Sequence, residues 1–258
     1  MGRLAFTGGR PVRNIRQNPW PKWPAWDRRE EKALLEVLHS GVWSYNGPKE
    51  RQFNQAFAKF NGTRYSLAIA NGTVTLQLAL EACGVGYGDE VIVPGLTWQA
   101  TAAAALDINA VPVLVDVTED TWCLDPARVE EAITPRTKMI ILNSPSNPTG
   151  VVMSQAEVDQ AIEIARKHDL LILSDEIYEP FLFDQLNGLP SSLHKYEKTI
   201  VLRGFSKSYA MTGWRLGYVF GYEPVVSQMT KLQQYTFVCA PSPFQHAALA
   251  ALDIDMTG

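Results

Sequence analysis

The stretch that decides the fold runs from Met139 to Asp175 and reads MIILNSPSNPTGVVMSQAEVDQAIEIARKHDLLILSD. Its two ends, residues 139–143 and 170–175, are short apolar runs that predict buried strands. Between them, the capping box that opens with Ser154 predicts a helix reaching His168. A strand, a helix and a second strand in this order predict two parallel strands joined by a crossover helix.

The same alternation of β-rich runs and helical spacing continues on both sides of this stretch, from Glu30 onward. It predicts an α/β fold, a three-layer sandwich with a mostly parallel central sheet covered by helices. Further strands are expected at Ser66–Ala70, Glu90–Pro94, Val111–Val117, Thr199–Leu202 and Leu216–Phe220, and further helices at Glu31–His39, Glu50–Phe60 and Gln245–Leu252.

The composition is that of an ordinary globular protein, and the length allows one large domain or two small ones. The chain has 258 residues, 46% of them hydrophobic, and a formal net charge of −4, which gives no electrostatic footprint for nucleic acid. The first 30 residues are basic and rich in tryptophan, with Trp20, Trp23 and Trp26 among arginines and prolines. We interpret residues 1–30 as an arm that lies on a protein surface, and residues 31–258 as the domain.

The cysteines and the N-terminal sequence indicate in which cellular compartment the protein is expected. Cys83, Cys123 and Cys239 are far apart and odd in number, so neither a disulfide framework nor a metal site is predicted. The N-terminus lacks the apolar segment of a secretory signal, and no stretch is long and apolar enough for a membrane span. We expect a soluble, cytoplasmic protein with no membrane partner.

The segment GFSKSYAMTGWR, Gly204 to Arg215, follows a predicted strand and contains the main candidate for chemistry. Taken alone, Lys207 reads as one more solvated surface lysine. An amine that attacks a carbonyl must be neutral part of the time, which a partly buried site and a cationic neighbour such as Arg215 favour. Lys207 is therefore a candidate nucleophile.

Three blocks resemble one known family. They are GFSK and MTGWRLGY within Gly204–Tyr218, NSPSNPTG at Asn143–Gly150 and SDEIYEPF at Ser174–Phe181. Their sequences, order and spacing are similar to those of class I aminotransferases, which are fold-type I enzymes dependent on pyridoxal 5′-phosphate (PLP). The resemblance implies PLP bound as a Schiff base on Lys207, the fold of the PLP-binding large domain, and a homodimer with its active site at the subunit interface.

The same resemblance implies roles for individual residues. Asp175 matches the carboxylate that keeps the cofactor's pyridine nitrogen protonated, and Asn147 and Tyr178 match the donors to its phenolic oxygen. Arg215 matches the phosphate-binding arginine, whose planar fork suits a phosphate dianion. Ser206 adds a candidate hydroxyl, although the family often has its phosphate-binding serine two positions earlier, where this chain has a glycine.

The first half of the chain resembles a different group. HSGVWSYNGP at His39–Pro48 and the segments Ala68–Ala102 and Pro112–Pro126 are similar to the DegT/StrS sugar and cyclitol aminotransferases. Gly72 and Thr73, between a strand and a helix, are expected to present backbone N–H groups to the cofactor's phosphate. The resemblance assigns Trp98 to stacking on the cofactor ring, with core packing as the alternative. Tyr45 is a further pocket candidate.

The class I pattern takes over between Asp125 and Met139. A natural divergent member and a recombinant of two homologous halves both account for this join, and we favour a constructed chimera. In class I enzymes a smaller domain follows and supplies an arginine for the substrate carboxylate, whereas this sequence ends at Gly258. We therefore expect a PLP site with weak turnover.

The reaction that the resemblance implies is transamination between a small-molecule amino donor and a keto acceptor. The motifs do not distinguish glutamate, glutamine or aspartate as the donor. Two alternatives stay open. One is a PLP-dependent lyase, racemase or decarboxylase, because the same cofactor linkage serves all of these reactions. The other is a PLP-binding scaffold with little turnover.

Overall fold

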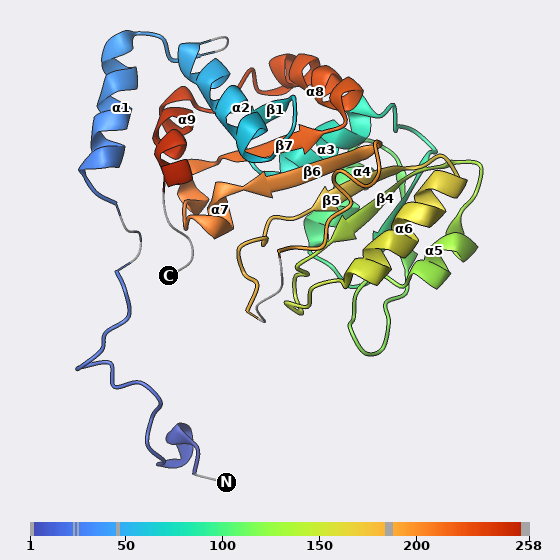
Figure 1. Cartoon of the computed structure of the whole chain (residues 1–258), viewed down its shortest axis with the longest axis horizontal. Coiled ribbons are helices and arrows are strands. Elements are labelled where there is room, and N and C mark those ends of the chain that lie inside the picture. The colour runs from blue at the N-terminus through green and yellow to red at the C-terminus, as the bar shows by residue number, and fades with distance from the viewer. Residues whose placement is uncertain (1–2, 23, 25, 45–46, 184–187, 254–258) are drawn as a thin grey trace.

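The structure, a computed structural model, describes residues 3–22, 24, 26–44, 47–183 and 188–253. Its centre is a seven-stranded sheet in the order β1-β7-β6-β5-β4-β2-β3 (Figure 1). The neighbours from β6 to β3 run parallel, and β7 runs antiparallel to both β6 and β1. The predicted, mostly parallel sheet is thus confirmed. The strands are β1 (Ser66–Ile69), β2 (Glu90–Pro94), β3 (Val111–Val115), β4 (Thr137–Asn143), β5 (Leu171–Asp175), β6 (Thr199–Gly204) and β7 (Gly217–Gly221).

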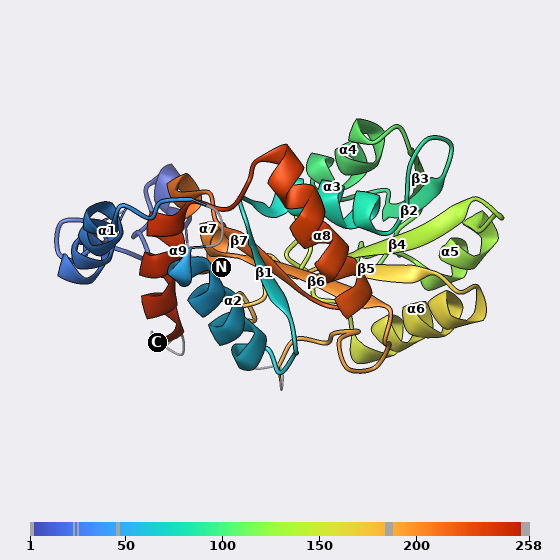
Figure 2. The ribbon, with the colours of Figure 1, turned by 90° about the horizontal axis from the view of Figure 1, so that it is seen from above.

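Helices cover both faces of the sheet, as Figure 2 shows from above. The layer on one face contains α3, α4 and α8, and the layer on the other contains α5 and α6 over one half and α2 and α9 over the other half. The helices are α1 (Arg28–Ser40), α2 (Pro48–Phe60), α3 (Gly72–Ala82), α4 (Gln99–Asp107), α5 (Pro126–Ala132), α6 (Gln155–Lys167), α7 (Phe205–Ser208), α8 (Glu223–Thr236) and α9 (Ser242–Leu249).

Side-chain alternation along the strands produces the three layers. In β2, Val91 and Val93 point to the core beneath α3, α4 and α8, whereas Ile92 points to the core beneath α5 and α6. In β6, Ile200 faces the first of these cores and Val201 faces the phenylalanine-rich core beneath α2 and α9. Because successive strand residues face opposite sides, apolar runs without polar alternation mark strands that are buried on both faces. The three-layer α/β sandwich is confirmed.

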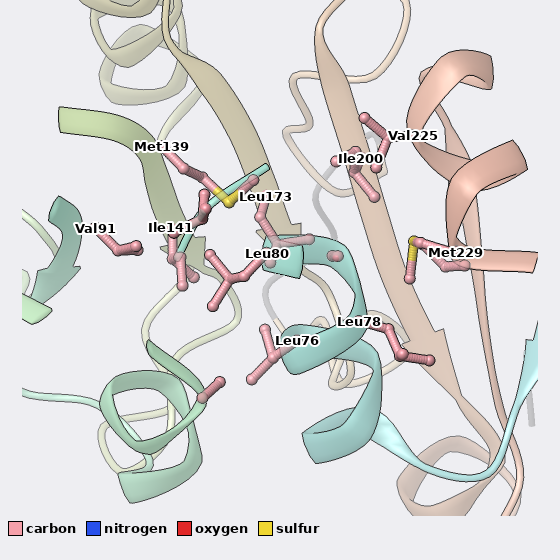
Figure 3. Packing of buried hydrophobic residues seen from close by; sticks show 14 of the residues in the cluster. Leu76, Leu78, Leu80, Val91, Met139, Ile141, Leu173, Ile200, Val225 and Met229 are labelled. Atoms are coloured by element: carbon pink, nitrogen blue, oxygen red, sulfur yellow. The ribbon is translucent and has the colours of Figure 1, made fainter. Parts of the chain in front are cut away.

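Helix α3 is the helix whose position matters most for the site. Leu76, Leu78 and Leu80 are nearly or fully buried and pack among strand residues and Met229 of α8 (Figure 3). Asn71 caps the helix, with its Oδ1 accepting a hydrogen bond from Val74 N at 3.2 Å. This packing fixes the N-terminus of α3 at the edge of the sheet where the parallel strands end.

Most predicted boundaries hold, with small corrections. The capping box of Ser154 and Glu157 is present, and α1 ends at Gly41 in the left-handed conformation. The third strand ends at Val115 instead of Val117, because Val117 forms an isolated bridge with Leu124 in the following loop. The last predicted helix begins earlier than expected, at Ser242, and from Ala250 it continues as a 3₁₀ turn.

The N-terminal region ahead of α1 extends away from the sheet (Figure 1). Its side-chain hydrogen bonds are local, such as those from Arg13 to Asn18 and Pro19. Helix α1 begins at Arg28, inside the range predicted for the arm, because Asp27 caps it, and the helix packs on α9. Within the described residues, no helix combines the length and apolar character needed to cross a bilayer.

Candidate active site

A cavity of about 220 Å³ lies at the edge of the sheet where β4, β5 and β6 end and α3 begins. This is the position at which open α/β sheets bind ligands. Nine of the site residues proposed from the sequence line this cavity: Gly72, Thr73, Trp98, Asn147, Asp175, Tyr178, Ser206, Lys207 and Arg215. Tyr45 lies outside the described residues.

Asp175 is the last residue of β5 and is 7% exposed. Burial raises the pKa of its carboxyl group to about 7, a backbone hydrogen bond from Ile177 works against the rise, and the neighbouring charge of Glu176 adds to it. Among the described residues it has no cation within ion-pair distance, and its hydrogen-bond donor is Ile177 N at 3.2 Å. A buried carboxylate of this kind suits a ligand that brings a positive charge.

A second part of the cavity lining is suited to an anion. Gly72 and Thr73 form the first turn of α3, which contains no acidic residue, so its free N–H groups and helix dipole favour negative charge. Arg215 lies nearby in the left-handed conformation and donates from Nη1 to Thr212 O at 3.0 Å. Within the described part of the chain, no carboxylate neutralises Arg215.

Ser206 lines the same cavity, and Gly204, two positions before it, lies close to the side chain of Ile177. A Cβ on Gly204 would lie 2.8 Å from Cδ1 of Ile177, closer than carbon atoms pack. Ile177 itself lines the cavity. The apolar side chain of Ile177 therefore occupies the space that a side chain at position 204 would need.

Asn147 and Tyr178 lie together on one wall. Asn147 Nδ2 donates to the Tyr178 hydroxyl oxygen at 3.2 Å, which leaves the Tyr178 O–H free to donate into the cavity. Lys207, in the short helix α7, places Nζ 6.0 Å from the centre of the Tyr178 ring. The sequence favoured a partly buried lysine, but Lys207, which lines the cavity, is exposed.

Trp98 is 60% exposed at the start of α4 and also lines the cavity. Its exposure argues against the alternative of core packing and leaves an aromatic face available to a planar ligand.

Asn143 is a site residue to which the sequence analysis assigned no role. It is 6% exposed at the end of β4, and its Oδ1 accepts hydrogen bonds from Thr97 Oγ1 at 3.3 Å and Asn147 N at 3.2 Å. It thereby joins the segment that precedes Trp98 to the loop that carries Asn147. The sequence feature that could have identified Asn143 is its position, because it is a polar residue at the end of an apolar strand, where open α/β sheets bind ligands.

Comparisons with known proteins agree with this geometry. An L-glutamine:2-deoxy-scyllo-inosose aminotransferase of Streptomyces paromomycinus is 47% identical over 178 residues, 67% of this chain and 40% of that protein. An L-glutamine:scyllo-inosose aminotransferase of Streptomyces griseus matches with the same identity and coverage. The chain therefore spans about 40% of the length of these curated relatives.

Solved structures give the same picture. Aspartate aminotransferase from Thermus thermophilus with maleate superposes with a TM-score of 0.80 at 31% identity, covering 89% of this chain and 63% of that one. The aromatic aminotransferase from Pyrococcus horikoshii gives 0.79 at 29% identity, covering 90% and 66%. The family model for aminotransferase class I and II matches residues 25–256, which include every cavity residue. The chain belongs to the class I and II aminotransferase family.

Proposed function

We propose that this chain holds PLP in the cavity at the ends of β4, β5 and β6 and is part of an enzyme that transfers amino groups. The observation that carries the proposal is the charge layout of the cavity. The buried carboxylate of Asp175, which has no ion-pair partner among the described residues, lies in the same cavity as an anion site made by Arg215 and the start of α3. PLP has a basic ring nitrogen, a phosphate and an aldehyde, and Lys207 supplies an amine for the aldehyde.

The described residues fit the cofactor group by group. PLP, when bound, withdraws electrons from the carbon that bears the amino group. Asp175 would hold the ring nitrogen protonated, and Asn147 and Tyr178 would donate hydrogen bonds to the phenolic oxygen. Lys207 Nζ would take a proton from the substrate's α-carbon and deliver it to the cofactor carbon that carried the aldehyde.

We propose glutamine as the amino donor and a carbocyclic keto sugar as the acceptor. The support is the identity of 42–47% to glutamine:inosose aminotransferases, against 28–31% to the matched aminotransferases of solved structure. To test the donor, glutamine, glutamate and aspartate are each added to the PLP-loaded protein, and the conversion of PLP to pyridoxamine phosphate is measured. Preference for aspartate over glutamine would refute this part.

Reduction with borohydride tests the cofactor linkage directly. We expect visible absorbance on addition of PLP, its loss on reduction, and a labelled peptide that contains Lys207. Lys207→Ala should remove the label, whereas Lys231→Ala, an exposed lysine on α8, should keep it. Label on another lysine, or no absorbance at saturating PLP, would overturn the proposal.

The homodimer, the cytoplasmic location and the division into an arm at 1–30 and a domain at 31–258 stay parts of the proposal. So does the chimeric origin. The interval between Asp125 and Met139 contains α5, the following loop and the start of β4. The match to the glutamine:inosose aminotransferases covers 67% of the chain and therefore extends beyond Met139, so it does not mark a join in this interval. Size-exclusion chromatography with light scattering tests the dimer.

A further inference from the structure

A buried ion pair lies directly behind the cavity. Arg203 of β6 donates to Glu176 Oε2 from Nε at 3.0 Å and from Nη2 at 2.8 Å. The other carboxylate oxygen, Oε1, accepts from Ser174 Oγ at 3.1 Å and Ser191 Oγ at 2.5 Å. The Glu176 side chain is 1% exposed and that of Arg203 is 16% exposed. Both oxygens of this carboxylate are thus satisfied without water.

The pair also reaches elements outside the site. Arg203 Nη1 donates to Asn61 Oδ1, after α2, at 3.1 Å and lies 3.7 Å from Glu179 Oε1. Its guanidinium is 5.4 Å from the centre of the Phe220 ring of β7. These contacts fix Arg203 in one orientation, which is what a fork-shaped hydrogen bond to a carboxylate requires.

Chain order connects this pair to the site. Glu176 follows Asp175, and Tyr178 comes two residues later in the same turn. Arg203 is one residue before the end of β6, and α7 with Lys207 follows at once. Asp175 and Leu202 line the cavity, whereas their neighbours Glu176 and Arg203 point to the opposite face of the sheet. The ion pair thus lies on the far side of the two strands that carry the site.

We propose that Glu176 and Arg203 are positioning residues, whose ion pair holds the turn bearing Asp175 and Tyr178 in a fixed register against the strand that leads into Lys207. The inference rests on the proposed function, since it concerns how accurately the PLP site is built. A gain in stability does not explain the pair, because apolar residues of similar volume often stabilise a core equally well. Accurate geometry is the property that a satisfied buried network does supply.

The test compares Glu176→Gln and the neutral double variant Glu176→Gln/Arg203→Gln with the wild type. The double variant is included because Glu176→Gln alone leaves Arg203 as a buried charge without its partner, which can prevent folding. The matched control is Glu90→Gln/Arg136→Gln at the start of β2, the opposite end of the sheet. There Glu90 is likewise buried and accepts from Arg136 Nε at 2.9 Å and Thr134 Oγ1 at 2.6 Å.

Three quantities are measured for each protein: the melting temperature without cofactor, the dissociation constant for PLP, and the visible circular dichroism of bound PLP per unit absorbance. We expect the site variants to bind PLP more weakly by roughly one to two powers of ten and to lose most of the circular dichroism. The control should bind PLP as the wild type does, whatever its melting temperature.

Unchanged PLP affinity and circular dichroism in the site variants, with only a lower melting temperature, would overturn the inference and leave a structural ion pair. Equal losses in the control would also overturn it, because the effect would then be general destabilisation. Failure of the wild type to bind PLP is a separate result, since it contradicts the proposed function itself.

Discussion

Asp175 links the stability of the cofactor-free protein to pH. Burial raises the pKa of this carboxyl group to about 7, above its value in the unfolded chain. The folded protein therefore keeps a proton that the unfolded chain loses, so this contribution to stability is present below about pH 4 and is lost as pH rises through 7. We expect Asp175→Asn to raise the free energy of unfolding at pH 8 by roughly 2–4 kcal/mol and to flatten its decline between pH 4 and 7.

Urea unfolding at several pH values checks this expectation. Asp159→Asn is the control, because the hydrogen bond from Lys195 lowers the pKa of that exposed carboxyl group, which gives the opposite sign. Its substitution should not flatten the decline. An Asp175→Asn protein that is less stable than the wild type at pH 8 would show that the carboxylate is neutralised in a way the structure does not contain.

If Arg215 binds the phosphate, its loss should affect the affinity for PLP and the affinity for pyridoxal differently. A guanidinium that pairs with phosphate contributes charge-assisted hydrogen bonds of about 1.5–3 kcal/mol, so Arg215→Met should weaken PLP binding by roughly ten- to a hundredfold. Binding of pyridoxal, which lacks the phosphate, should hardly change. Fluorescence titrations with both ligands measure this. Arg64→Met, an exposed arginine at the other end of the sheet, is the control, and an equal loss for both ligands would contradict the phosphate role.

At the scale of elements, the two capped helices α3 and α6 offer a comparison. Asn71 and Ser154 each accept a backbone hydrogen bond at a helix start, so Asn71→Ala and Ser154→Ala should each cost about 1 kcal/mol of stability. Of these two helices, α3 contributes its first turn to the cavity lining and α6 does not. Asn71→Ala should therefore also weaken PLP binding, and Ser154→Ala should not. Equal PLP affinity in the two variants would mean that the start of α3 takes no part in binding.

How far the sequence predicts each element follows from the range of the interactions that form it. The capping box at Ser154 and the stop at Gly41 involve residues a few positions apart, and both are correct. The placement of β7 between β1 and β6 depends on pairing between distant segments, which no local pattern contains. Arg203 reads from sequence as a charge at a strand end, and its partner Glu176 is 27 residues away.

The residues of the site also differ in how far the sequence predicts them. Lys207, Asp175 and Arg215 are predictable because their motifs resemble a known family, and the structure brings them to one cavity. The role of Asn143 could not be predicted from a motif, because it consists of contacts with two loops that meet only in the folded sheet. Ile177 is similar, since only the packed structure shows that it fills the space beside Gly204.

At the scale of the whole molecule, the region ahead of α1 is expected to be dispensable for the cavity. The side-chain hydrogen bonds of its described residues are local, and no described residue before Asn71 lines the site. Deletion of residues 1–26, which keeps Asp27 as the cap of α1, should leave the PLP affinity unchanged and the melting temperature within about 2 °C. Calorimetry and a PLP titration measure both. A variant that no longer binds PLP would contradict the proposed division of the chain.

The pairing of β1 with β7 has a consequence for how the protein emerges from the ribosome. Among the described strands, β1 comes first in the chain and its partner β7 comes last, roughly 150 residues later. At 5–20 residues per second, the nascent chain exposes Leu67 and Ile69 for about 7–30 s before β7 exists. Gly72 and Arg215 are separated in the same way, so the cofactor cannot assist folding until nearly all strands have been made. We therefore expect aggregation of this chain to be most pronounced in the interval before β7 is made.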